Sequence, residues 1–73
     1  MNITVNGESV TTTATTLTGY LDSIGIDSGR VAVELNEEIV PKKEYATTAL
    51  KPGDRMEIVQ FVGGGSRSQG ELS

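Results

Sequence analysis

The stretch LKPGDRMEIVQFVGGG, residues 50–65, contains the local signals that decide the fold. Proline and glycine stand at the two central positions of KPGD. In a type II turn the first of these positions suits the fixed negative φ of proline, and the second needs the positive φ that glycine allows. Residues 55–62 follow as a strand, with Met56 and Ile58 on the face that meets a core. The sequence therefore predicts a turn, a strand and then three consecutive glycines.

The first twelve residues predict a β-hairpin. Apolar and polar residues alternate in NITVNGESV, which places Ile3 and Val5 on one face. Asn6-Gly7 is a favoured dipeptide for a tight turn with positive backbone angles. We therefore expect two antiparallel strands over residues 2–12.

The period then changes to that of a helix. Apolar residues recur at i, i+3, i+4 and i+7, as Leu17, Tyr20, Leu21 and Ile24. Thr15 or Thr16 is the expected N-cap, and Gly25 the left-handed C-cap, with Ile26 placed to make the accompanying apolar contact. Because Gly19 costs about 1 kcal/mol relative to alanine inside a helix, we expect this helix to depend on packing.

The segment RVAVELN returns to period two and predicts a strand with one solvated face. Val31, Val33 and Leu35 point inward, and Pro41 in the irregular crossing that follows favours an edge or a turn. One helix packed across a mixed sheet of four or five short strands buries these faces economically. This order of elements is that of the α+β, ubiquitin-like β-grasp fold, whose first and last strands lie side by side. We assign it to residues 1–62.

Composition narrows the function. The chain has 73 residues, a formal charge of −4, and neither cysteine nor histidine. It therefore lacks the usual nucleophile, the residue that titrates near neutral pH and the best transition-metal ligands. The charge argues against nucleic acid as a partner, and no targeting or membrane-spanning segment is evident. We expect a cytoplasmic protein that is not an enzyme and binds no cofactor or metal.

The segments VAVELNEEIVP and LKPGDRMEIVQFVGGG, and their spacing, resemble the sulfur carriers of thiamine biosynthesis, the ThiS family, over residues 1–65. The resemblance implies that an ATP-dependent adenylating enzyme, ThiF-like and E1-like, activates the carboxylate of Gly65. Sulfur from a persulfide, supplied by a donor such as a cysteine desulfurase, then replaces AMP. The resulting thiocarboxylate gives its sulfur to a ThiG-like thiazole synthase. Gly63 and Gly64 would form a flexible arm.

A docking surface is expected beside this arm. If Met56 and Ile58 face the helix, Glu57, Val59 and Phe61 face outward. Val59, Phe61 and Val62 are the candidate partner-binding residues, because an exposed apolar patch suits a partner. The alternative is that Phe61 packs on a loop.

The chain departs from the carrier pattern after Gly65. Ser66 opens an eight-residue polar tail that ends at Ser73 and has the composition of a disordered segment. No adenylate can form while Gly65 is held in an amide. The tail is explained by a precursor that a peptidase trims, by a segment introduced in cloning, or by loss of the chemistry.

Other functions fit parts of the pattern. The small subunit of molybdopterin synthase is also a β-grasp that ends in glycines, although prolines usually precede them there. A ubiquitin-like protein modifier would use the same glycine end, and a simple interaction domain would treat GGGSRSQG as a linker. Carrier and modifier differ in product, which is a thiocarboxylate in the first and an isopeptide in the second.

Overall fold

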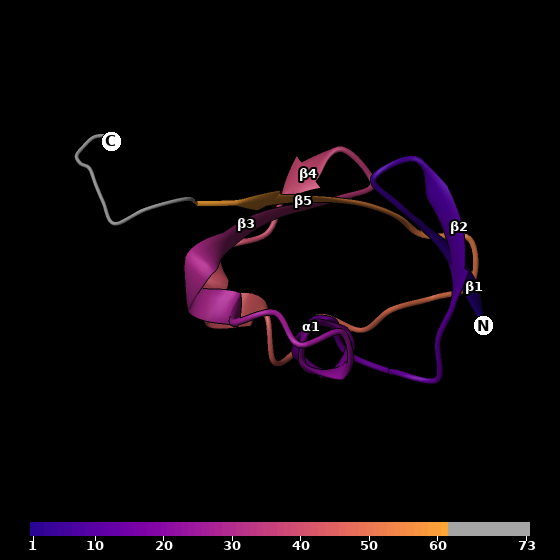
Figure 1. The fold of residues 1–73 in the computed structure, drawn as a ribbon, viewed down its shortest axis with the longest axis horizontal. Coiled ribbons are helices and arrows are strands. Elements are labelled where there is room, and N and C mark those ends of the chain that lie inside the picture. The colour runs from indigo at the N-terminus through magenta and orange to yellow at the C-terminus, as the bar shows by residue number, and fades with distance from the viewer. Residues whose placement is uncertain (62–73) are drawn as a thin grey trace.

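The computed structural model describes residues 1–61 of the chain. Their elements are β1 (Asn2–Val5), β2 (Glu8–Thr11), α1 (Leu17–Ser23), the 3-10 helix η1 (Ser28–Arg30), β3 (Val31–Leu35), β4 (Glu38–Ile39), the 3-10 helix η2 (Lys42–Glu44) and β5 (Arg55–Gln60). The strands form one five-stranded sheet in the order β2-β1-β5-β3-β4, and α1 lies across one of its faces (Figure 1). The predicted α+β, ubiquitin-like β-grasp is confirmed.

The hairpin has the predicted turn. Asn6 and Gly7 both have positive φ, 50° and 84°, as a two-residue turn between twisted strands requires. In the antiparallel register Ile3 lies opposite Val10. The alternation and the turn dipeptide were therefore sufficient to predict β1 and β2.

The last strand occupies the middle of the sheet. β5 pairs with β1 in parallel, Val5 lying opposite Met56, and with β3 in antiparallel register from Val31↔Gln60 to Leu35↔Met56. The strand ends at Gln60, so the predicted strand over residues 55–62 was too long, and Val62 lies outside the described residues. β5 is central because it pairs with β1 along one edge and with β3 along the other.

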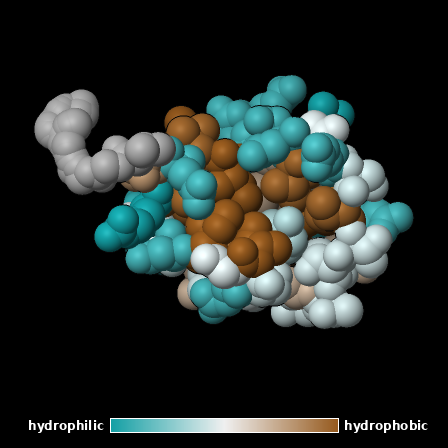
Figure 2. Space-filling model, viewed as in Figure 1, coloured by the Kyte–Doolittle hydropathy of each residue, from teal (hydrophilic) through white to brown (hydrophobic). Residues whose placement is uncertain are grey.

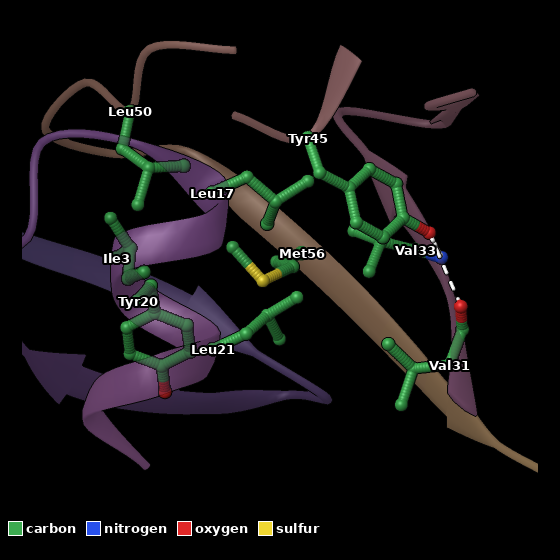
Figure 3. Close-up of a cluster of buried hydrophobic side chains, with 9 residues drawn as sticks. All are labelled: Ile3, Leu17, Tyr20, Leu21, Val31, Val33, Tyr45, Leu50 and Met56. Carbon is green, nitrogen blue, oxygen red and sulfur yellow. Dashed lines mark hydrogen bonds between the residues drawn. The ribbon is translucent and has the colours of Figure 1, made fainter. Parts of the chain in front are cut away.

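The core lies between the sheet and α1. Its nine buried apolar side chains come from β1, α1, β3, β5 and the connection between η2 and β5 (Figure 3): Ile3, Leu17, Tyr20, Leu21, Val31, Val33, Tyr45, Leu50 and Met56. Apolar side chains also gather between the sheet and α1 in the space-filling view (Figure 2). The prediction that Ile24 completes the helix stripe was wrong, because Ile24 is the C-cap residue and is 44% exposed.

The two ends of α1 explain the glycine within it and the glycine that follows it. Thr16 is the N-cap, and its hydroxyl oxygen accepts from the backbone N–H of Gly19 at 3.1 Å. A Cβ on Gly19 would lie 3.1 Å from the same oxygen, so the small residue leaves room for the cap. At the other end Gly25 has φ of 76°, and Ile26 donates to the carbonyl of Leu21 at 2.9 Å. This Schellman-type ending confirms the predicted left-handed glycine at the end of the helix, one residue after the C-cap Ile24.

Among the described residues, no helix is long and apolar enough to cross a membrane.

Candidate functional site

The predicted acceptor and arm lie outside the described residues. This applies to Gly63, Gly64 and Gly65, to the candidate contact Val62, and to residues 66–73. The structure does define the end of β5, from which the chain continues toward them. That end lies at the opposite side of the molecule from Met1 (Figure 1).

Phe61, the last described residue, is held by backbone and side-chain contacts. Its N–H donates to the carbonyl of Arg30 at 3.0 Å, which continues the β3–β5 ladder by one bond. The ammonium group of Lys42 lies 5.6 Å from the centroid of the Phe61 ring, within cation–π range. The same ammonium donates to the carbonyl of Gly29 at 2.7 Å. Phe61 nevertheless remains 57% exposed.

The sheet face turned away from α1 carries a shallow, open hollow of about 560 Å³. We call it the outer hollow, and it is lined by Ala32, Val33, Glu34, Glu37, Ile39, Arg55, Glu57 and Val59. Ile39 is 77% exposed and Val59 is 59% exposed. Three carboxylates and one guanidinium surround these apolar side chains, so the outer hollow is apolar in part and acidic on balance.

Val59 and Phe61 line different hollows. Val59 borders the outer hollow, whereas Phe61 borders a second one of about 370 Å³ beside the loop that contains Gly25 and Asp27. Phe61 therefore combines the two alternatives raised by the sequence, since it is exposed and also lies beside a loop. Ile39 is the apolar residue of this surface that sequence reasoning missed, because it stands alone among charged residues in NEEIVP.

Two segments that carried the resemblance meet in the structure. The Asn36 side-chain N–H donates to one carboxylate oxygen of Asp54 at 3.0 Å, and the Lys51 N–H donates to the other at 2.8 Å. The Arg55 N–H donates to the side-chain oxygen of Asn36 at 3.0 Å. Asp54 thus caps the KPGD turn and also connects it to the β3–β4 turn. Sequence spacing alone gave no sign of this second role.

Within the described residues no group of three or more histidine, cysteine, aspartate or glutamate side chains is arranged to hold a metal ion.

The fold defines the class of the molecule, a small ubiquitin-like β-grasp protein, and in the sequence three glycines follow shortly after its last strand. The ThiS family model matches residues 2–65. The chain is 35% identical to the thiamine biosynthesis protein ThiS of Geobacter metallireducens, whose crystal structure superposes with a TM-score of 0.75 over 89% of this chain and 100% of that one. The chain belongs to the ThiS family.

Two relatives of known name extend the comparison. The chain is 42% identical over 50 residues to the sulfur carrier protein ThiS of Bacillus subtilis, covering 68% of this chain and 76% of that one. It is 49% identical over 67 residues to a thiazole synthase of Paramagnetospirillum magneticum, covering 90% of this chain. It spans only about a fifth, 21%, of that longer relative.

Proposed function

We propose that this chain is a sulfur carrier of thiamine biosynthesis that is acted on by partner enzymes and has no catalytic activity of its own. The carboxylate of Gly65 attacks the α-phosphorus of ATP on an adenylating enzyme, and pyrophosphate leaves. The terminal sulfur of a persulfide then attacks the acyl adenylate and displaces AMP, which gives an acyl disulfide. A thiol reduces this disulfide by attacking the donor's sulfur, so that the S–S bond breaks and a thiocarboxylate is left on Gly65. These steps take place in the cytoplasm, where ATP is available.

The family match through residue 65 is the observation that carries this proposal. It includes all three glycines and ends at the residue that would hold the sulfur. The relative from Bacillus subtilis is itself named a sulfur carrier. The fold adds a rigid central strand that leads directly to this segment.

Glycine suits the acceptor segment for a physical reason. A chain without Cβ atoms can pass through a narrow channel and adopt angles that other residues avoid. Fixing each such residue on an enzyme costs about 1–2 kcal/mol of conformational entropy. Contacts made by the folded body must offset that cost, and the outer hollow with Ile39 and Val59 is the surface best suited to make them.

The proposed sulfur acceptor is a ThiG-like thiazole synthase. A domain similar to this chain occupies part of a much longer relative that is named thiazole synthase. The presence of a carrier-like segment within a protein named thiazole synthase supports a functional association between carrier and synthase. The adenylating enzyme and a sulfur donor such as a cysteine desulfurase complete the proposed set of partners.

The residue after Gly65 makes one further step necessary. In the present sequence Ser66 holds the Gly65 carbonyl in an amide, which cannot be adenylated. We propose that a peptidase hydrolyses this bond and releases residues 66–73.

An exchange assay tests the activation step. The chain ending at Gly65 should support ATP–pyrophosphate exchange by the adenylating enzyme, whereas the 73-residue chain should not. Deleting Gly64 and Gly65 from the shorter chain should abolish the exchange and leave the unfolding temperature unchanged. Equal exchange by all three proteins would contradict the proposal.

A further inference from the structure

Lys42 joins three separate parts of the chain beside the end of β5. It belongs to η2, its ammonium donates to the Gly29 carbonyl at 2.7 Å, and it lies 5.6 Å from the centroid of the Phe61 ring. A single cation therefore connects η2, η1 and the last described residue.

The hydrogen bond beneath this cation lies at the end of the ladder. The Phe61 N–H donates to the Arg30 carbonyl at 3.0 Å, one step beyond the Val31↔Gln60 pair. End bonds of a ladder open most readily, because fewer neighbours hold them. Lys42 contacts the ring of Phe61, which is the donor residue, and the carbonyl of Gly29, which is next to the acceptor residue Arg30. It is therefore placed to keep this bond closed.

We propose that Lys42 is a positioning residue that fixes the point from which the sulfur-accepting segment leaves the sheet. This role rests on the proposed function, in which Gly65 is the acceptor. With Phe61 fixed, the acceptor is reached through residues 62–65 alone. Four extended residues span at most about 14 Å, so a partner must place its nucleotide site within that distance of Phe61.

Without the ammonium group of Lys42, the bond from Phe61 to Arg30 opens more often, and docking must then restore it. An exposed cation–π contact is worth about 0.5–1 kcal/mol, which corresponds to a change of about two- to five-fold. Because the cost falls on docking, the KM of the adenylating enzyme for the carrier should rise by this factor. The kcat should stay constant.

Hydrogen exchange of the isolated protein provides the direct test and needs no enzyme. In Lys42→Met the Phe61 amide should exchange about two- to five-fold faster, and Lys42→Arg should restore the original rate because a guanidinium keeps both contacts. Lys43→Met is the matched control, since Lys43 lies in the same 3-10 helix and makes neither contact. An unchanged rate in Lys42→Met, or an equal increase in Lys43→Met, overturns the proposal.

A double-mutant cycle with the adenylating enzyme tests the functional part. If Lys42 acts through the ring, Lys42→Met should raise KM in the wild-type background and have no further effect beside Phe61→Leu. Additive effects would mean that Lys42 contacts the enzyme directly, and would overturn the positioning role. Failure of the wild-type Gly65-ended chain to be adenylated would instead contradict the proposed function. The hydrogen-exchange result for Lys42→Met would not be affected by that failure.

Discussion

At the scale of single residues, two side chains complete the hydrogen bonding of strands where a neighbouring strand has ended. The Asn6 amide donates to the Ile58 carbonyl at 3.3 Å and accepts from the Ile58 N–H at 2.7 Å, across 52 positions of sequence. The buried Tyr45 hydroxyl accepts from the Val33 N–H at 3.1 Å and donates to the Val31 carbonyl at 3.3 Å (Figure 3). Both side chains act as substitutes for missing strand backbone.

Neither of these two roles could be predicted from the sequence. Asn6 was recognised as a turn residue because that signal is local, but its partner is fixed by the parallel pairing of β1 with β5. Tyr45 lies in an irregular connection with no period to indicate that it is buried. Contacts of this range depend on the completed sheet.

Replacing Tyr45 by phenylalanine should lower the free energy of unfolding. The change leaves the buried Val33 N–H without a partner, which costs about 1–3 kcal/mol. Urea unfolding should show the loss. Tyr20→Phe is the control, because Tyr20 is also buried and its hydroxyl has no hydrogen bond to the described residues. Equal losses in both variants would contradict the assigned role of the Tyr45 hydroxyl.

At the scale of elements, the sequence predicted best where the signal is local. The hairpin turn, the helix stripe and its glycine cap, and the KPGD turn each need only a few adjacent residues. Predictions were weaker at ends of elements: Ile24 left the stripe and β5 stopped two residues early. There the course of the chain depends on which neighbour is present to pair or pack.

The N-cap of α1 gives a prediction at this scale. The sequence left Thr15 and Thr16 open, and the structure assigns the cap to Thr16. Thr16→Ala should destabilise the protein by about 0.5–2 kcal/mol, because the Gly19 N–H loses its side-chain acceptor. Thr15→Ala should change stability little, since no described contact uses the Thr15 hydroxyl. Thermal unfolding compares the two, and a larger loss in Thr15→Ala would contradict the assignment.

At the scale of the whole molecule, the sheet separates a face buried against α1 from a face exposed to solvent. Met56 is buried against α1, whereas Val59 of the same strand opens onto the outer hollow. Alternation along β5 predicted this division. The sequence did not predict that Ile39 and three carboxylates would line the outer hollow, because β4 is only two residues long and is positioned by β3.

Replacing Val59 by aspartate should weaken binding to the adenylating enzyme by about tenfold or more, as loss of a central apolar contact does. The fold should persist, because the side chain is 59% exposed. Titration calorimetry with the Gly65-ended chain measures the effect. Ile24→Asp is the matched control, since Ile24 is 44% exposed but lies at the end of α1, away from the outer hollow. Equal affinity for wild type and Val59→Asp would exclude the outer hollow as the docking surface.

The most direct test of the central claim is the intact mass of the protein. The chain ending at Gly65 is incubated with the adenylating enzyme, ATP and a sulfur donor, and is compared with the protein recovered from its native cells. We expect the incubated chain to gain the mass of an oxygen-to-sulfur exchange and the native protein to end at Gly65. A native protein that retains Ser66 to Ser73, together with a shorter chain that never gains sulfur, would contradict it.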